Sequence, residues 1–221
     1  MFTDKMLQLV GVGILETFYM TLSATALAYL IGLPLGLVLV ISDPAGIHPM
    51  PKLNKVLGAI INLLRTAPFL ILLMLLIPFT RLLIGTTIGA SAMVPPLFIA
   101  AFPFVARMVE SSVKEVDAGV VEAAQSMGAS TLQIVCKVLL PEAMPSLING
   151  SAVAAITILG YSAMAATIGG TGLGQIAIVY GHQRFNQDII WFAALLCIII
   201  VQVIQEVGMY IVRKTDKRTS A

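Results

Sequence analysis

Few side chains in this 221-residue sequence could carry chemistry, and those few are not grouped as a catalytic site would require. His48 and His182 are far apart, and Cys136 and Cys197 lie in a polar and an apolar stretch respectively. This pattern predicts neither a disulfide nor a metal site. The sequence contains no G-x-x-x-x-G-K-[ST] motif, so the chain cannot cradle nucleotide phosphates itself. We therefore predict no catalytic residue and no cofactor bound by this chain.

Some polar side chains lie inside apolar runs, where they need a partner or water. The run at 148–168 is the least apolar, and it includes Gly160, Tyr161, Ser162 and Met164. Tyr161 and Met164 are three residues apart, which places them on one face of a helix. We interpret these four residues as lining a path for a solute, with ordinary hydrogen bonding between helices as the alternative. A thioether beside an aromatic ring favours an apolar solute.

Arg65 is the one charged residue well inside the second apolar run, 56–79. A charge within the membrane is usually functional. Arg65 is also only two or three turns from one end of its run, so its long stem could reach the membrane interface. Both interpretations remain open from the residues alone.

The composition indicates a polytopic membrane protein, with 58% hydrophobic and only 11% charged residues. No basic stripe with interleaved aromatic residues is present, which argues against nucleic-acid binding. Five runs are long enough for helices that cross a bilayer, which needs roughly 20 apolar residues each. The expected fold is therefore all-α. The runs cover residues 17–41, 56–79, 88–109, 148–168 and 188–212.

The positive charges indicate the orientation of these spans. Arg65 lies within a run and is left out of the count of positive charges. The odd number of spans, together with this count, predicts an external N-terminal segment (1–16), a membrane domain (17–212) and a cytoplasmic tail (213–221). One side then carries Lys5, Arg81 and Arg184. The other, cytoplasmic side carries Lys52, Lys55, Arg107, Lys114, Lys137, Arg213, Lys214, Lys217 and Arg218.

Small residues and prolines mark two of the spans. A line of small side chains in the first span predicts close helix packing, within the chain or against a partner; it consists of Ala24, Ala28, Gly32 and Gly36. Prolines in the third span predict that it is buried or lines a path, because they free backbone carbonyls; they are Pro95, Pro96 and Pro103. "GGTGLG" at 169–174 lacks the spacing of a dinucleotide fingerprint and is interpreted as a flexible external connection.

A polar segment at 114–145 separates the third and fourth spans. Asp117 is suited to cap a helix that runs through Met127, and Gly128 to end it in a left-handed conformation. Ser130 and Gln133 fit a capping box for a second helix, which we expect to end before Pro141. The residues alone fit either a docking segment or an amphipathic pair of helices at the membrane interface.

The same segment resembles the EAA motif of ABC importer permeases. The match consists of Glu122-Ala123-Ala124, Gly128 and Leu140-Pro141, with Val138 where the family usually has Ile. The resemblance implies that this segment, called here the coupling segment, docks on a cytoplasmic ATPase. It implies that Glu122, Ala123 and Ala124 enter the ATPase cleft while Gly128 sets the bend. Met127, which is pliable, also suits docking into a partner's cleft.

Wider strings resemble the methionine importer permeases in particular. They are "RTAPFLILLMLLIPFTRLLIGTTIG" (65–89), "PFVARMVE" (103–110), "LGYSAMAATIGGTGLGQ" (159–175) and "YGHQRF" (180–185). The resemblance implies a type I ABC importer fold and gives Arg65, Arg107 and Glu110 structural or coupling roles. It also implies a homodimer in a bacterial inner membrane, two copies of an ATPase that uses ATP and Mg, and a periplasmic or lipid-anchored methionine-binding protein. The alternatives are a permease of this fold for another amino acid, or a passive channel or scaffold.

Overall fold

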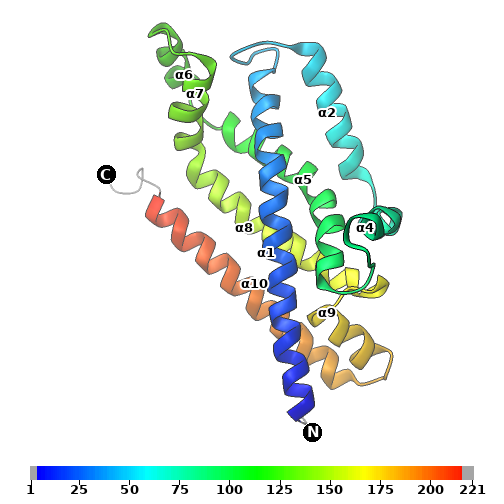
Figure 1. The fold of residues 1–221 in the computed structure, drawn as a ribbon. Helices are drawn as coiled ribbons and strands as arrows, with labels where there is room; N and C mark the ends of the chain where they lie inside the picture. Colours follow the sequence, from blue (N-terminus) through cyan, green and yellow to red (C-terminus); the bar gives the residue numbers. More distant parts are fainter. Residues whose placement is uncertain (1–3, 216–221) are drawn as a thin grey trace. The chain divides into compact units, whose positions relative to one another are not determined.

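The structure is a computed structural model that describes residues 4–215, and these residues form helices and no strand. This confirms the predicted all-α fold. The longer helices, shown in Figure 1, are α1 (Asp4–Ile41), α2 (Pro51–Thr66), α3 (Phe69–Leu75), α4 (Ile77–Ile84), α5 (Ala90–Lys114), α6 (Ala118–Ser126), α8 (Leu140–Ala165) and α10 (Gln187–Thr215). The shorter helical pieces are α7 (Thr131–Ile134), α9 (Leu173–Gln175), π-helical segments Val135–Leu139 and Ile176–His182, and a 3-10 turn at Ala166–Ile168.

Within residues 4–215, four helical stretches are long and apolar enough to cross a membrane. They lie in α1, in α5, in the continuous helix Thr131–Ile168, and in α10. A fifth span results if α2 and α3 together count as one broken span. The predicted five spans thus correspond to four or five in the structure. The end of the predicted tail, from residue 216 onward with Lys217 and Arg218, lies outside the described residues, as do residues 1–3.

A single second helix over 56–79 is a wrong prediction. The region instead contains α2, α3 and α4, and the first break falls at Ala67 and Pro68. Pro68 has an extended backbone, with φ −58° and ψ 128°. A proline disfavours the helical conformation of the residue before it, so α2 ends there although the run stays apolar.

The chain divides into two compact units, and α1, α5, α8 and α10 each contribute residues to both. The first unit comprises the residues up to Leu27 together with Ala67–Ala101 and Ala154–Glu206. The second unit comprises Ala28–Thr66, Phe102–Val153 and the residues from Val207 onward. The coupling segment therefore lies in the second unit, and the predicted path residues lie in the first.

The first unit packs around a core to which α1, α8, α9 and α10 contribute. The buried members are Val10, Leu159, Leu173, Ile176, Ala193 and Ile200.

The glycine-rich stretch 169–174 is an ordered part of this unit, so its interpretation as a flexible connection is wrong. The Gly172 amide donates to the Glu16 carboxylate at 3.1 Å, and the Leu173 amide donates to the Thr17 hydroxyl at 3.0 Å. Leu173 is fully buried. These long-range contacts fix a backbone that its glycines would otherwise leave free.

In the second unit, α1 packs closely against α5 through the predicted line of small residues. A Cβ on Gly32 would lie 2.7 Å from Val105 Cγ1, and one on Gly36 would lie 2.7 Å from Val109 Cβ. Larger residues would therefore push the two helices apart. At these two positions the line serves packing within the chain. The core beside it consists of Leu39, Ile61 and Ala106, with Leu35 and Leu57 packed against it.

Candidate functional site

Helix α6, in the coupling segment, begins and ends at the residues that the sequence indicates. The Asp117 carboxylate accepts a hydrogen bond from the Gly119 amide at 2.7 Å, which satisfies one of the free amides of the first turn. At the other end Met127 is the C-cap, and Gly128, which follows it, has φ +77°. The Ala129 amide then donates back to the Ala124 carbonyl at 3.1 Å. This left-handed turn reverses the chain directly into the next helix.

The second helix starts at the predicted capping box. The Ser130 amide donates to Gln133 Oε1 at 2.8 Å, and the Gln133 amide donates to Ser130 Oγ at 3.4 Å. Its predicted end before Pro141 is wrong, because the helix continues from Thr131 to Ile168. The π-helical segment Val135–Leu139 comes directly before α8, so the backbone hydrogen-bond pattern changes just where Pro141 removes an amide donor. The second helix of the coupling segment is thus continuous with the fourth span.

The residues of the predicted docking motif differ in exposure. Glu122, Ala123, Gly128 and Pro141 are exposed, and the Met127 side chain is 82% exposed. Ala124 is buried and Leu140 is half-buried, so these two hold the hairpin together rather than face outward.

Two further exposed apolar residues extend this surface. Val120, Ala123 and Met127 are spaced i, i+3 and i+7, which puts them on one stripe of α6. Leu132, across the turn, is also exposed. We call these four residues the α6 face. Val120 and Leu132 were not among the residues predicted from the sequence, although the helical spacing of Val120 with Ala123 and Met127 could have identified it. With nine residues, α6 is too short to cross a bilayer, so its exposed apolar face suits contact with a protein partner or with the membrane interface.

The predicted charges Arg107 and Glu110 form a salt bridge in the last turns of α5. Arg107 Nη1 lies 2.7 Å from Glu110 Oε2, and Arg107 Nη2 donates to the Gly58 carbonyl of α2 at 2.9 Å. Arg65 does not join them. It is exposed in the last turn of α2 and forms no salt bridge with any described residue.

An ion pair that was not predicted from the sequence extends this group. Lys114 Nζ lies 2.8 Å from Asp43 Oδ2 and 3.0 Å from Glu110 Oε1. The hydrogen bond from Lys114, and then that from the Ala45 amide, hold the pKa of Asp43 below its ordinary value of 3.8. Asp43 is therefore ionised at neutral pH. Because 71 residues separate Asp43 from Lys114, no local pattern could have predicted the pair.

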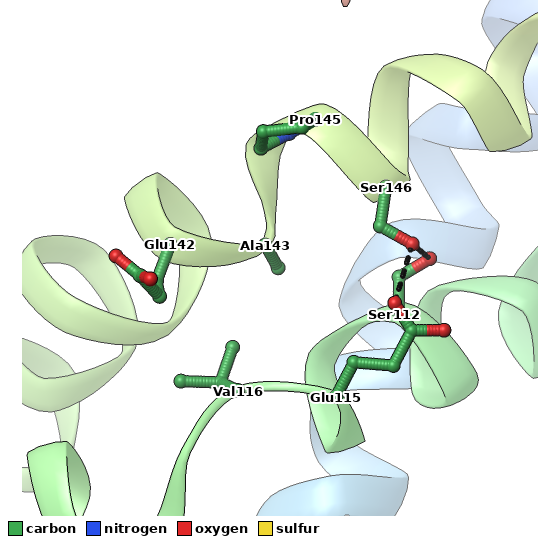
Figure 2. A pocket seen from close by; sticks show the side chains of 7 residues that line it. All are labelled: Ser112, Glu115, Val116, Glu142, Ala143, Pro145 and Ser146. Carbon is green, nitrogen blue, oxygen red and sulfur yellow. Dashed lines mark hydrogen bonds between the residues drawn. The ribbon is translucent and has the colours of Figure 1, made fainter. Parts of the chain in front are cut away.

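A small cavity of about 180 Å³ lies where α5 and α8 meet at the ends of the coupling segment. Figure 2 shows Ser146 of α8 pointing toward Ser112 and Glu115 at the end of α5. The Ser146 hydroxyl is 2.9 Å from Ser112 Oγ and 3.0 Å from Glu115 Oε2. Glu142 also lines the cavity. No group of three metal-ligating side chains occurs in the part of the chain that the structure describes.

The predicted path residues lie on two sides of α8. Gly160 is exposed with open space at its Cα, and the Met164 side chain is 49% exposed. Tyr161 stacks on Phe69, the first residue of α3, with ring centroids 4.1 Å apart and planes 8° apart. Ser162 is only 2% exposed, and its hydroxyl donates to the Leu159 carbonyl at 2.7 Å. Ser162 therefore does not share the face of the other three, and Phe69 is a neighbour that the sequence analysis missed.

Comparisons with known proteins agree with this geometry. The family described as "Binding-protein-dependent transport system inner membrane component" matches residues 32–221. The "Probable D-methionine transport system permease protein MetI" of Vibrio cholerae is 46% identical over 203 residues, which cover 92% of this chain and 90% of that protein. The "Methionine import system permease protein MetP" of Bacillus subtilis is 48% identical over 165 residues, 75% of this chain and 74% of that protein.

Solved structures of ABC transporters also resemble this chain. A chain of the structure described as "Inward facing conformations of the MetNI methionine ABC transporter" matches with a TM-score of 0.95 and 42% identity, covering 97% of this chain and all of that one. A chain of an amino-acid ABC transporter solved with histidines matches with a TM-score of 0.77 at 23% identity, which supports the fold alone. The chain described here is a multi-pass membrane protein that belongs to the family of binding-protein-dependent transport system inner membrane components.

Proposed function

We propose that this chain is the permease subunit of an ATP-driven importer that carries methionine across a bacterial inner membrane. The observation that carries the proposal is the match over 97% of the chain to a methionine ABC transporter. Relatives that are 46% and 48% identical are likewise named for methionine transport. As the transport subunit, the chain hydrolyses nothing itself, and ATP and Mg are used by a partner ATPase.

The α6 face is the proposed docking surface for that ATPase. Its support is the exposed apolar stripe of α6 together with the EAA motif at Glu122–Ala124. Gly128, which sets the reversal after α6, and the capping box at Ser130 make the hairpin rigid enough to transmit force. Leu140 and Pro141 then connect it to the fourth span.

The proposed translocation path runs along the face of α8 that carries Gly160, Tyr161 and Met164. Gly160 and Met164 are exposed and Tyr161 is half-buried, which supports this, and in a homodimer the same face of the second copy would form the opposite wall. The Met164 thioether and the Tyr161 ring suit contact with the side chain of a methionine substrate. The buried position of Ser162 argues against a direct role for this residue.

The proposed mechanism is alternating access between two copies of this chain. ATP binding closes two ATPase subunits, which draws the docked α6 helices together and opens the path outward to an external methionine-binding protein. Hydrolysis reverses the movement. A swing from 1:99 to 99:1 needs roughly 5.5 kcal/mol of differential interaction, which requires a rigid connection. The positive charges predict an external N-terminus and a cytoplasmic C-terminus.

The test is reconstitution of the chain with an ATPase and a methionine-binding protein in proteoliposomes. We expect methionine to stimulate ATP hydrolysis and to enter the vesicles only when ATP is present. If histidine or another amino acid competes better than methionine, the fold assignment stands and the substrate is wrong. Entry without ATP would instead favour the passive channel.

A further inference from the structure

We propose that Asp43 and Lys114 are positioning residues that link the coupling segment to α1 and α2, so that motion of α6 moves these helices. The inference rests on the proposed function, because it concerns how an ATPase docked on the α6 face would move the path. It adds residues outside the EAA motif to the coupling apparatus.

The link is a continuous series of charged contacts across α5. Lys114 is the last residue of α5 and lies three positions before the Asp117 cap of α6. Its ammonium group contacts Asp43, in the loop between α1 and α2, and also Glu110. Glu110 contacts Arg107, which donates to the Gly58 carbonyl of α2. The start of the coupling segment is thus connected both to the α1–α2 loop and to α2 itself.

A contact transmits motion only if both of its ends are rigid, and the Asp43 end is well supported. The Asp43 carboxylate accepts from the Ala45 amide at 3.0 Å, and its carbonyl accepts from the Gly46 amide at 2.8 Å. The His48 amide donates to the Ile41 carbonyl at 3.0 Å. Asn54 of α2 donates to the Leu39 carbonyl of α1 at 2.7 Å. The loop is therefore a folded connection between α1 and α2.

Direct packing between α6 and the α1–α2 loop does not replace the link. A cavity of about 250 Å³ lies beside α6, with Val40, Gly46 and Ile47 from the end of α1 and the loop, and Glu122 and Gln125 from α6, among the residues that line it. Lys114 also borders this cavity. Because of this cavity, apolar contact between α6 and the loop is incomplete. The ion pair therefore supplies a connection that packing alone does not make.

The Asp43–Lys114 pair is partly exposed, so a role in coupling can be tested separately from a role in stability. The Lys114 side chain is 45% exposed and that of Asp43 is 27% exposed. Ion pairs with solvent access contribute little to stability. By contrast Glu110 is only 12% exposed, and Arg107 Nε is buried without a partner, so variants of these two residues risk misfolding. Asp43 and Lys114 can therefore be changed while the fold is kept.

The experiment compares Asp43→Asn and Lys114→Gln with the wild type in proteoliposomes that contain the assembled ATPase. The measured quantity is methionine taken up per ATP hydrolysed. We expect this ratio to fall about fivefold or more, which is the lower end of typical coupling between sites. The amount of assembled complex should stay at the wild-type level. Lys114→Arg should retain the ratio. The double variant should be no worse than Lys114→Gln, because that change already removes the contact with Asp43 as well as the one with Glu110.

The matched control is Lys52→Gln, which removes an exposed positive charge from the first turn of α2. An unchanged ratio in both single variants would overturn the link. So would an equal fall in Lys52→Gln, or a fall explained by lost complex. Failure of the wild type to couple methionine to ATP would overturn the proposed function and this inference with it. Normal coupling in wild type and variants alike would overturn only the inference.

Discussion

Gly128 owes its proposed role in the turn after α6 to its backbone conformation. Its φ of +77° lies in the left-handed region, and a Cβ there would meet no neighbouring atom. The constraint is therefore the backbone itself rather than crowding. For a residue other than glycine, this conformation costs roughly 1–2 kcal/mol.

Gly128→Val should abolish ATP-driven methionine uptake while normal amounts of permease remain in the membrane. The valine shifts the turn, so α6 meets the ATPase at a different angle. Uptake and permease content are measured in the same vesicles. The control is Gly11→Val, because Gly11 also has open space but a negative φ in α1. Wild-type uptake by the Gly128 variant would rule out a coupling role for this turn.

Arg65, exposed in the last turn of α2, is a second residue whose role can be tested alone. The sequence predicts a role in architecture or coupling rather than in substrate recognition. Arg65→Lys keeps the charge but loses the planar guanidinium. We expect this variant to transport the same amino acids in the same order of preference, measured by competition for uptake. A changed preference with intact coupling to ATP would assign Arg65 to the substrate site instead.

At the scale of single helices, α6 and α8 each divide into faces with different surroundings. On α6, Val120, Ala123 and Met127 face outward while Ala124 is buried. On α8, Gly160 and Met164 are exposed while Ser162 is buried. The 3.6-residue repeat produces both divisions.

The α6 face predicts that Met127→Glu weakens association with the ATPase. A carboxylate in an apolar contact must be desolvated without a partner, and losses of 2 kcal/mol or more are typical of central interface residues, about a 30-fold loss of affinity. Co-purification of the ATPase in detergent measures this. Ser126→Glu, exposed next to the apolar stripe, should retain binding. Equal loss in both variants would indicate general charge repulsion.

The two faces of α8 predict different reactivity of introduced cysteines. In a background with Cys136 and Cys197 replaced by serine, Tyr161→Cys and Met164→Cys should react with a membrane-impermeant thiol reagent, because a water-filled path reaches them. Ser162→Cys should stay unreactive as the buried control. Labelling is compared with and without trapped nucleotide. If neither Tyr161→Cys nor Met164→Cys reacts in either state, the path does not follow this face.

At the scale of the whole molecule, the chain presents much apolar surface that it does not cover itself. Exposed large apolar side chains occur along α1, α2, α4 and α10. Lipid accounts for such surface in a membrane protein, but the path proposed along α8 would also need a second wall.

We therefore expect the purified complex to contain two copies of this chain and two of the ATPase. The detergent-corrected mass from light scattering, together with the ratio of the two polypeptides, measures this stoichiometry. A complex with one copy of each would leave the Gly160–Met164 face without its opposite wall and would contradict the proposed path.

The sequence by itself determined the features that depend on local interactions. Abundant apolar residues fixed the all-α membrane class, because backbone groups in lipid must be satisfied within a helix. The Asp117 cap, the left-handed Gly128 and the Ser130–Gln133 box were predicted because each involves residues at most a few positions apart.

The tertiary structure alone decided what depends on distant residues or on competition between local signals. A proline ends the helix at Pro68, whereas the helix continues through Pro141. Of the two, only Pro141 directly follows a π-helical segment, where the hydrogen-bond pattern of the helix changes. The burial of Ser162 depends on what packs against α8. The Asp43–Lys114 pair joins residues 71 positions apart, and only the folded chain brings such charges within 3 Å.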